Sequence, residues 1–387
     1  MLASLQRELD QRKTDGLLRQ RRLLDSPQAE HIVANEQPYL SFCSNDYLGL
    51  ANRPELIAAM QKAAGDSGVG SGASNLITGH HRYHDALEKQ LAAFVELPAA
   101  LLFSTGYMAN IGVLGALTGR GDAIFADKLN HACLNDGAYF SHAEFQRYPH
   151  NDVAALEKLL QASTAKHKLI AADAVFSMDG DIAPIPEYLA LCEKYDAYLY
   201  LDDAHGFGVL GEHGKGSLSH FKVKSPRIIM MATLGKAAGV AGAFVAGEQV
   251  VIDYLIQKAK SYVYSTPAPP ALSATLSASV QLIEQGDDLR ANLNRSIAYL
   301  KNNLKLNQWQ LMDSDTPIQP LVVGGNKEAL ALSEYLQTCG ILVPAIRPPT
   351  VPVGTARLRI SLSAAHTQDD MKKLVEAIHQ AESELAA

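Results

Sequence analysis

The sequence IIMMATLGKAAG, residues 228–239, guides the interpretation of the whole chain. Its apolar run, Ile228–Met231, is typical of a buried β-strand, and it stops at Thr233 and Gly235 before one lysine, Lys236, set among small residues. Crowded, poorly solvated surroundings lower the pKa of an amine and make it a nucleophile toward carbonyl carbons. The stretch therefore indicates either a reactive lysine at the end of a strand or an ordinary lysine that points to water.

Strand-like runs alternate with helical patterns from about residue 100 to residue 250, which predicts an α/β domain with a mainly parallel, seven-stranded sheet. Several of the runs are almost wholly apolar, as expected for strands covered on both faces. The predicted strands are Ala100–Phe103, Ala123–Ala126, Glu144–Tyr148, Leu169–Phe176, Ala197–Leu201, Ile228–Ala232 and Ala243–Ala246. Ligands of such sheets bind at the carboxyl ends of the strands.

The remaining patterns divide the chain into an N-terminal segment (1–50), a large domain (51–288) and a smaller α+β domain (289–387). The N-terminal segment is expected to begin with an amphipathic helix over residues 1–24 and to include a strand at Pro38–Phe42. The small domain is predicted to contain three strands and two helices: Ile318–Val323, Lys327–Thr338, Ile341–Ile346, Arg357–Ser361 and Gln368–Leu385.

The composition excludes several classes of protein. The 387 residues carry a net charge of −7, which argues against binding to nucleic acid. The four cysteines form no CxxC pair, so we expect neither a zinc framework nor a disulfide framework, and a reducing cytoplasm fits best. The sequence has no signal-peptide pattern and no apolar run of membrane-spanning length.

Two acids and a histidine follow another predicted strand, in DDAHGFG at residues 202–208. Buried carboxylates at the end of a strand are costly unless they bind something. With Lys236 as a Schiff-base lysine, one carboxylate could hold the ring nitrogen of pyridoxal phosphate, and His205 could hydrogen-bond its phenolic oxygen. A metal site built from Asp202 and His205 is the alternative. The GxGxxG match at residues 206–211 is discounted, because a loop rather than a helix follows it.

Further polar residues close other predicted strands. Ser104–Asn110 combines a Thr-Gly turn with the start of a helical pattern, which suits a phosphate. His131 could stack on a flat ring, and Ser177 closes a third strand. Two metal readings remain: an acidic turn with Asp179 and Asp181, which lacks the full calcium-loop pattern, and a histidine pair, His80 and His84, on one helix face. Because the strand ends recur every 25 to 45 residues or so, one pocket can collect them.

Five phrases, spread over most of the chain, together resemble the α-oxoamine synthase family of fold-type-I pyridoxal phosphate enzymes: SNDYLGL (44–50), GSGAS (70–74), FSMDGD (176–181), DDAHG (202–206) and TLGK (233–236). Residues 345–359, AIRPPTVPVGTARLR, resemble members that use alanine more than those that use glycine. The resemblance implies a cytoplasmic homodimer that condenses L-alanine with a pimeloyl thioester, on coenzyme A or acyl-carrier protein, with loss of CO2 in biotin biosynthesis.

The resemblance also implies a role for each matched residue. Lys236 would form the Schiff base and move the Cα proton, Asp202 would hold the pyridinium, and His205 and Ser177 would bond the phenolic oxygen. His131 would stack over the ring and line the substrate site. The phosphate would be held by Gly106, Tyr107 and Thr233, together with Ser265 and Thr266 reaching across from a partner subunit. Arg359 and Asn45 would take the carboxylate of the amino acid, and Arg19 and Thr350 would line the acyl path.

Three alternatives remain beside this interpretation. A glycine-using member of the same family would differ in its product. A metal-dependent hydrolase would use Asp202, His205 and the His80–His84 pair, whereas the preferred interpretation expects no metal. A binding protein that keeps the fold without the chemistry is the third, and it is disfavoured because every expected chemical position is filled.

Overall fold

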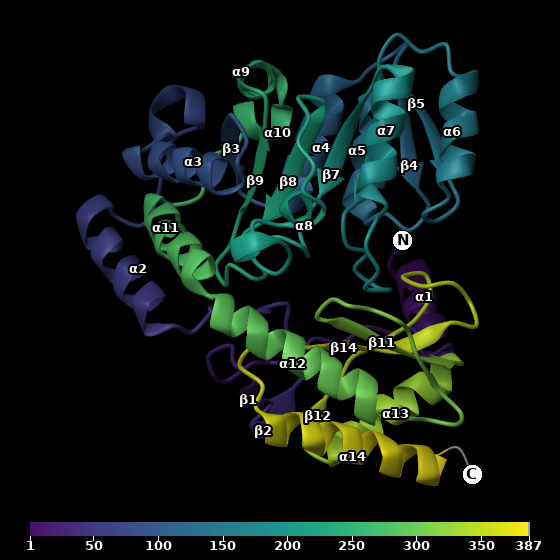
Figure 1. Cartoon of the computed structure of the whole chain (residues 1–387). Coiled ribbons are helices and arrows are strands. Elements are labelled where there is room, and N and C mark those ends of the chain that lie inside the picture. Colours follow the sequence, from purple (N-terminus) through teal and green to yellow (C-terminus); the bar gives the residue numbers. More distant parts are fainter. Residues whose placement is uncertain (386–387) are drawn as a thin grey trace. The chain divides into compact units, whose positions relative to one another are not determined.

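The computed structural model describes residues 1–385, and the chain divides into two compact units. The terminal unit comprises Met1–Gly49, Met178–Asp181 and Leu289–Ala387, and the central unit comprises Leu50–Ser177 and Ile182–Asp288. The purple start and the yellow end of the chain both belong to the terminal unit (Figure 1). The core of the central unit is therefore built from one long, nearly continuous stretch of sequence.

A seven-stranded sheet forms the centre of the central unit, in the order β3-β9-β8-β7-β6-β4-β5. All neighbours are parallel except β9, which pairs antiparallel with both β3 and β8. This confirms the predicted mainly parallel α/β sheet. The strands are β3 (Ala99–Phe103), β4 (Ala123–Asp127), β5 (Glu144–Tyr148), β6 (Lys168–Asp173), β7 (Ala197–Asp202), β8 (Ile228–Thr233) and β9 (Ala243–Gly247).

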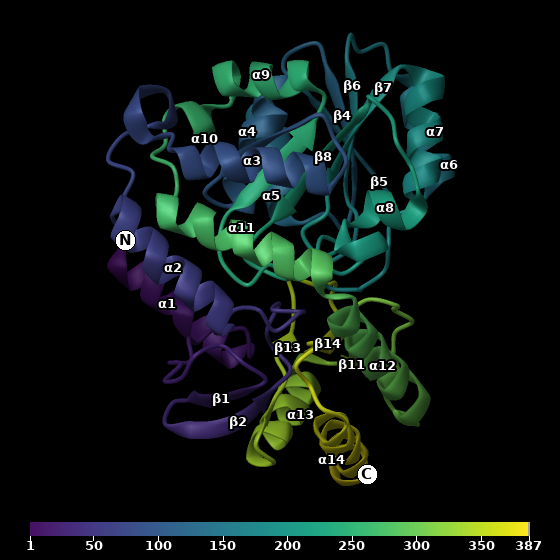
Figure 2. The ribbon, with the colours of Figure 1, turned by 60° about the vertical axis from the view of Figure 1, so that its left-hand side comes forward.

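Helices cover both faces of this sheet, which explains why its strands are apolar on both sides. One face packs against α4 (Gly106–Leu117), α5 (Ala132–Ser141), α9 (Gln249–Lys258) and α10 (Lys260–Val263). The other face packs against α3 (Arg82–Phe94), α6 (Val153–Ala162) and α7 (Ile185–Tyr195), with α8 (Ser217–Phe221) beside α7 (Figures 1 and 2). On that second face, Phe207 makes edge-to-face contacts with Phe94 of α3 and Phe244 of β9.

Two further helices of the central unit, α2 (Pro54–Ser67) and α11 (Pro270–Gln285), lie against each other, and α11 also packs on α3 (Figure 2). Both begin with a proline in the first helical turn, where the missing N–H would have had no partner. Two short turns, η1 (Asn75–Gly79) and η2 (Glu212–Gly214), complete the unit.

The terminal unit contains two small sheets. In the first, β2 (Gln37–Ser41) pairs antiparallel with β1 (His31–Ala34) and parallel with β12 (Ile341–Leu342). The second is antiparallel, with the order β10 (Gln310–Leu311), β11 (Ile318–Gly324), β14 (Ala356–Ser361) and β13 (Ala345–Ile346). The helices are α1 (Leu2–Thr14), α12 (Asp287–Asn303), α13 (Asn326–Thr338) and α14 (Gln368–Leu385), of which α13 and α14 pack together. Residues from both ends of the chain therefore share a sheet.

Three predicted elements were wrong in extent. The N-terminal helix ends at Thr14 rather than at residue 24, because Gly16 adopts a left-handed φ of 64° and the chain leaves the helical path. The strand predicted for residues 341–346 is two strands in different sheets, since Pro344 lies between them. The strand predicted to reach residue 176 stops at Asp173, where Ala174 N–H donates to Asp202 O across the sheet and Val175 bridges to Ile182.

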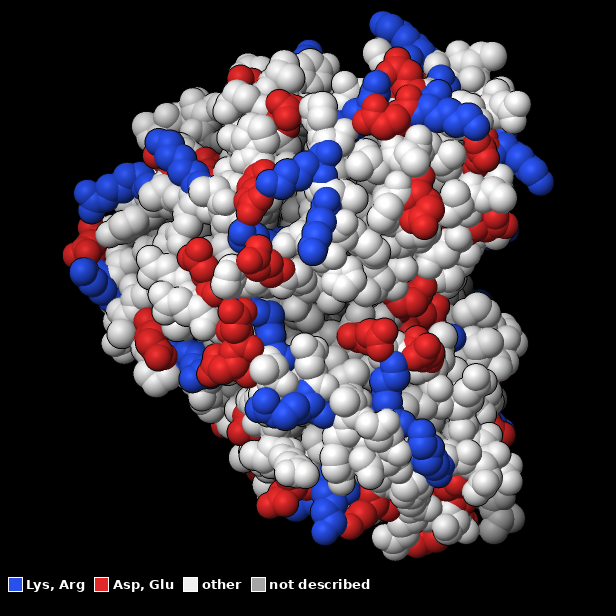
Figure 3. Space-filling view, viewed as in Figure 1, with Lys and Arg blue, Asp and Glu red and all other residues white. Residues whose placement is uncertain are grey.

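Charged side chains of both signs are interspersed on the face drawn in Figure 3, and no large basic area dominates it. This agrees with the negative net charge of the sequence. Among residues 1–385, no helix has the length and apolar character needed to cross a bilayer.

Candidate active site

The carboxyl ends of the parallel strands bring most of the predicted site residues to one edge of the central sheet. Gly106 follows β3, His131 follows β4, Ser177 follows β6, His205 follows β7 and Lys236 follows β8. Because these strands run in the same direction, their following loops lie at the same edge. The predicted spacing of polar strand ends thus becomes a cluster in space.

Lys236 lies in a tight loop between β8 and β9. Leu234 N–H donates to Gly242 O at 2.8 Å, and Gly239 N–H donates to Lys236 O at 2.8 Å, so the backbone on both sides of the lysine is fixed. Gly239 has a φ of 70°, and a Cβ there would lie 2.6 Å from Ala51 N, so only glycine fits. The side chain of Lys236 places its Nζ 2.8 Å from Nε2 of His205. The two predicted catalytic groups are therefore in contact.

The two aspartates at the end of β7 have different surroundings. Asp202 is buried, its Oδ2 accepts from Asn110 Nδ2 at 2.7 Å, and its Oδ1 accepts from Ala204 N–H at 3.1 Å. Hydrogen bonds from an amide and a backbone N–H stabilise the ionised carboxylate and fix its orientation, so that it can bind a cationic partner. Asp202 is therefore the better candidate for binding a ring nitrogen.

Asp203 is fully buried, and its Oδ2 accepts from Ser217 N–H at 2.7 Å, whereas its Oδ1 has no hydrogen-bond partner among residues 1–385. Gly206 and Gly216 press against the carboxylate so closely that a Cβ at either position would collide with it. Burial, the largest effect, raises the pKa of Asp203 to about 7. Protein atoms surround the Asp203 carboxylate, so a ligand cannot reach it.

His131 forms the N-cap of α5, with its Nδ1 3.4 Å from Cys133 N–H and 2.7 Å from Cys133 Sγ. Its backbone N–H donates to the buried carboxylate of Asp173 at 2.6 Å, which ties the histidine to the end of β6. Burial lowers the pKa of His131, the nearby Asp202 charge opposes that effect, and the Lys236 charge adds to it. The imidazole is thereby biased toward its neutral form.

The start of α4 has the features of an anion site. Thr105 caps the helix by accepting from Met108 N–H at 3.1 Å. The backbone N–H groups of Gly106 and Tyr107 have no acceptor within residues 1–385. A Cβ on Gly106 would be 3.8 Å from Thr233 Cβ, so the predicted phosphate residues from two strand ends lie together. Unsatisfied N–H groups and the helix dipole favour a phosphate at this position.

Ser265 and Thr266 lie in the loop after α10 and line a small cavity of about 30 Å³ that also touches Ser104 and Gly242. Thr233 Oγ1 donates to Gly242 O at 3.1 Å. The two hydroxyl residues therefore share a cavity lining with Ser104 and Gly242 of their own chain, and their predicted contact with a partner's phosphate stays a prediction. Ser177 is partly buried at the end of the chain segment that follows β6.

Four of the predicted substrate residues belong to the terminal unit, namely Arg19, Asn45, Thr350 and Arg359, whereas the fifth, His131, belongs to the central unit. Arg359, on β14, is 5% exposed and donates to Asn45 Oδ1 at 3.1 Å, to Ser361 Oγ at 2.8 Å and to Tyr47 Oη at 3.4 Å. These three contacts fix the position of the guanidinium, a group that can bind a carboxylate through two parallel hydrogen bonds. Arg19 Nη2 is 3.5 Å from Thr350 Oγ1, so that predicted pair also lies together.

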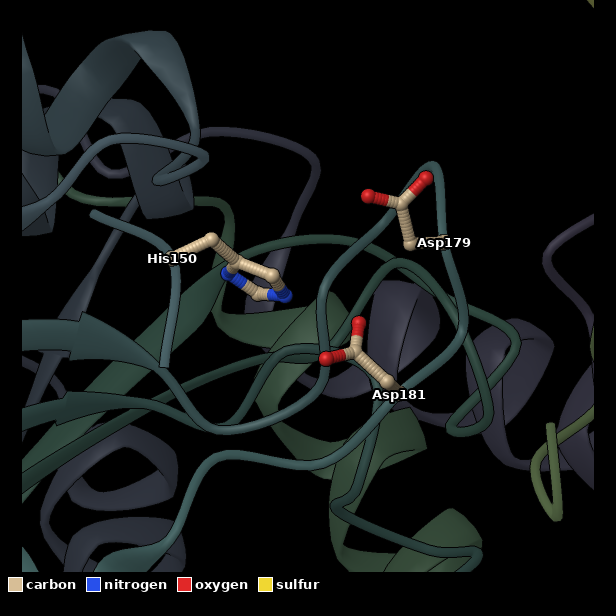
Figure 4. A group of neighbouring side chains, drawn as sticks. All are labelled: His150, Asp179 and Asp181. Atoms are coloured by element: carbon tan, nitrogen blue, oxygen red, sulfur yellow. The ribbon is translucent and has the colours of Figure 1, made fainter. Parts of the chain in front are cut away.

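The metal readings lose support from the contacts of their residues. Asp179, drawn with Asp181 and His150 in Figure 4, forms an ion pair with the buried guanidinium of Arg357, and His150 belongs to the other unit. In the histidine pair, His84 accepts from His81 N–H through Nδ1 at 2.9 Å and contacts Ala268 O through Nε2 at 2.8 Å. Both ring nitrogens of His84 are occupied, so it has no lone pair left for a metal.

Three residues of the cluster were not predicted from the sequence: Asn110, Cys133 and Tyr200. Asn110 and Tyr200 are fully buried, and Cys133 is 3% exposed. The signal that could have found Asn110 is a single amide inside the otherwise apolar helix GYMANIGVLGAL, since a buried amide needs several partners. Cys133 and Tyr200 carry no comparable pattern.

Comparisons with known proteins agree on one family. The family model for aminotransferase class I and II matches residues 37–378. An 8-amino-7-oxononanoate synthase of Methylobacillus flagellatus is 58% identical over 382 residues, covering 99% of this chain and 96% of that protein. One from Nitrosospira multiformis is 58% identical over 381 residues, covering 98% of this chain and 96% of that protein.

Solved structures are similar as well. A serine palmitoyltransferase variant from S. paucimobilis, with a bound PLP–myriocin aldimine, has a TM-score of 0.94 at 26% identity and covers 99% of this chain and 98% of that chain. An 8-amino-7-oxononanoate synthase from Francisella tularensis has a TM-score of 0.78 at 29% identity, covering 90% of this chain and 99% of that chain.

Proposed function

This chain belongs to the aminotransferase class I and II family and to its 8-amino-7-oxononanoate synthases, and from that premise we propose that it joins L-alanine to a pimeloyl thioester. The products are 8-amino-7-oxononanoate, CO2 and the free thiol carrier, which places the reaction in biotin biosynthesis. The chain is a pyridoxal phosphate-dependent enzyme of the acyl-transferring α-oxoamine synthase type.

The residues of the central unit fit this cofactor. The free N–H groups at the start of α4 suit its phosphate, the buried Asp202 suits its ring nitrogen, and Lys236 suits its aldehyde. When bound, pyridoxal phosphate supplies an aldehyde that condenses with amines and a protonated ring that withdraws electrons from a bond at Cα. Gly106, Tyr107 and Thr233 are proposed to hold the phosphate.

The protein groups have separate tasks in this proposal. Asp202 keeps the ring nitrogen protonated, since a buried carboxylate stabilises a neighbouring cation. Lys236 moves the Cα proton, and its contact with His205 gives the amine a partner for that proton. His205 and Ser177 hydrogen-bond the phenolic oxygen, and His131 stacks over the ring.

The substrate and partner roles are proposed for residues outside this core. Arg359, supported by Asn45, takes the carboxylate of alanine, because a guanidinium binds a carboxylate through two parallel hydrogen bonds. Arg19 and Thr350 line the path of the acyl chain. Ser265 and Thr266 reach the phosphate held by a second copy of the chain, which makes the working form a homodimer, and the enzyme is proposed to act in the cytoplasm.

The observation that most supports the proposal is the 2.8 Å contact between Lys236 Nζ and His205 Nε2. Lys236 follows β8, and His205 follows the neighbouring strand β7, which ends at the buried Asp202. A lysine, a histidine and a carboxylate on adjacent strand ends satisfy the requirements of a pyridoxal phosphate site together.

The deciding experiment is thiol release from pimeloyl-CoA by the cofactor-loaded protein, with L-alanine and glycine in parallel. Release with alanine, and a product with the mass of 8-amino-7-oxononanoate, supports the proposal. Release only with glycine assigns the sister activity instead. If neither amino acid gives release, the same assay with pimeloyl-acyl-carrier protein tests the other donor, and failure there refutes the proposed reaction.

Two controls separate the cofactor from a metal. Borohydride treatment should fix the cofactor covalently on the peptide that contains Lys236, and Lys236→Ala should abolish that mass increase. A chelator should leave thiol release unchanged. Loss of activity with the chelator, restored by added metal, would support the metal-dependent hydrolase.

A further inference from the structure

Asn110 is a buried residue that hydrogen-bonds to two parts of the candidate site in the central unit, Asp202 at the end of β7 and Cys133 in α5. It lies on α4 with no exposed surface. Its Nδ2 donates to Asp202 Oδ2 at 2.7 Å and to Cys133 Sγ at 2.9 Å, and its Oδ1 accepts from Tyr200 Oη at 2.7 Å. Both hydrogens of the amide nitrogen and its oxygen are used, so this side chain has one hydrogen-bonded arrangement.

The orientation of the amide follows from its neighbours. A flipped amide would set its oxygen against the Asp202 carboxylate, where two acceptors repel each other. It would also set the NH2 group against Tyr200, whose hydroxyl is fully buried and now donates to Oδ1. Asp202 and Tyr200 therefore fix the direction in which Asn110 donates to Cys133.

The thiol of Cys133 continues this chain of hydrogen bonds to His131. Sγ accepts from Asn110 and lies 2.7 Å from His131 Nδ1. Cys133 N–H also approaches Nδ1 in the N-cap of α5, but at 3.4 Å this contact is weak, so the thiol at 2.7 Å is the main group that holds the lone pair on Nδ1. Burial, the largest effect, raises the pKa of the Cys133 thiol to about 12, so the S–H proton is available to donate.

We propose that Asn110 and Cys133 are positioning residues that couple Asp202 to His131 and hold the imidazole in the tautomer with the proton on Nε2. The proposal rests on the proposed function in one respect: Asp202 and His131 are taken as the groups that meet the cofactor ring. A fixed Nδ1 acceptor leaves Nε2–H as the one donor that His131 can offer to cofactor or substrate. The same amide that orients the carboxylate then also sets the proton position on the imidazole.

The test uses Cys133→Ala, Cys133→Ser and a matched control, Cys192→Ala. Cys192 is equally buried but lies on α7, outside these contacts. Histidine ring nitrogens are observed by 15N NMR of cofactor-loaded protein, and His131 is assigned by the signal lost in His131→Gln. A protonated ring nitrogen and one with a free lone pair resonate in separate ranges, so the spectrum reports the tautomer directly.

We expect the parent and Cys192→Ala to show Nε2–H for His131, and Cys133→Ala to show a mixture of tautomers. Cys133→Ser, which keeps a hydroxyl donor, should restore Nε2–H. In thiol release, kcat of Cys133→Ala should fall about tenfold with KM for alanine changed less than about twofold, because the imidazole is misplaced rather than lost. Cys133→Ser should recover kcat to within about threefold of the parent.

Two outcomes overturn the proposal: an unchanged His131 tautomer in Cys133→Ala, or Cys133→Ser as impaired as Cys133→Ala in both tautomer and kcat. The tautomer is read in protein that is not turning over, so it remains informative if thiol release fails for every substrate. In that case the proposed reaction is refuted while the positioning network is still tested.

Discussion

Replacing Asp203 with asparagine should make the pH dependence of stability differ from that of the parent protein. Asp203 is fully buried, and the pKa of its carboxyl is raised from 3.8 to about 7, chiefly by burial. The neutral carboxyl is thus favoured in the folded state, and the charged form is favoured in the unfolded chain. The contribution of this carboxyl to the free energy of unfolding is at its maximum below about pH 4, and it is lost as the pH rises from there through about 7.

The size of the effect follows from the two pKa values. At about 1.4 kcal/mol per tenfold change in equilibrium, moving from 3.8 to about 7 corresponds to about 4 kcal/mol in total. Between pH 5 and pH 8 the parent loses about 2 to 3 kcal/mol of this amount. Asparagine cannot ionise, so Asp203→Asn loses none of it.

The measurement is the free energy of unfolding of parent and variant in urea, at pH 5 and at pH 8. The difference between variant and parent should move in favour of the variant by about 2 to 3 kcal/mol from pH 5 to pH 8. Taking this double difference cancels any packing cost of the substitution that does not depend on pH. Asp66→Asn, on the exposed side of α2, is the matched control and should give a double difference near zero. A value near zero for Asp203→Asn, or one of opposite sign, would refute the reasoning.

Three further predictions concern other parts of the molecule. Thr105→Ala should cost about 1 kcal/mol of stability through the lost cap and weaken pyridoxal phosphate binding several-fold in a fluorescence titration, and Thr105→Ser should restore both. Arg359→Lys should raise KM for alanine about tenfold or more in steady-state kinetics, because lysine cannot form the paired hydrogen bonds, whereas kcat should change less. Phe207→Ala should lower the free energy of unfolding by about 3 to 5 kcal/mol in urea titrations, while Tyr198→Ala, at a side chain 42% exposed, should change it little.

Much of the fold was predictable because its strands have a strong local pattern. Runs such as Ile228–Met231 and Ala123–Ala126 are apolar throughout, which only burial on both faces explains. The order of strands and the antiparallel placement of β9 were not predictable, since they depend on tertiary packing rather than on periodicity. The helix over residues 1–24 failed because its apolar stripe includes Leu17 and Leu18, which lie beyond Gly16.

The candidate site was predictable where a residue ends a strand. Lys236 and His205 each come within a few residues of the end of an apolar run, so these ionisable side chains are conspicuous in the sequence around them. The local pattern alone did not choose between Asp202 and Asp203, and the prediction of Asp202 came from the family resemblance. Adjacent residues of an extended chain face opposite sides, and only the packing of Gly206 and Gly216 encloses Asp203. The role of Asn110 could not be predicted for a related reason: its three hydrogen-bond partners lie on other elements, far away in the sequence.

The sheet that joins β2 to β12 has a consequence for how the protein is made. Residue 41 ends β2 and residue 341 begins β12, so about 300 residues separate two strands that pair in register. At a translation rate of roughly 5 to 20 residues per second, about 15 to 60 seconds pass between the emergence of the first strand and that of its neighbour. Throughout that interval the nascent chain carries an open strand edge, and the whole central unit is synthesised before β12 appears. One edge of β2 thus finds its partner only late in synthesis, and an unpaired strand edge is a template for pairing with another chain.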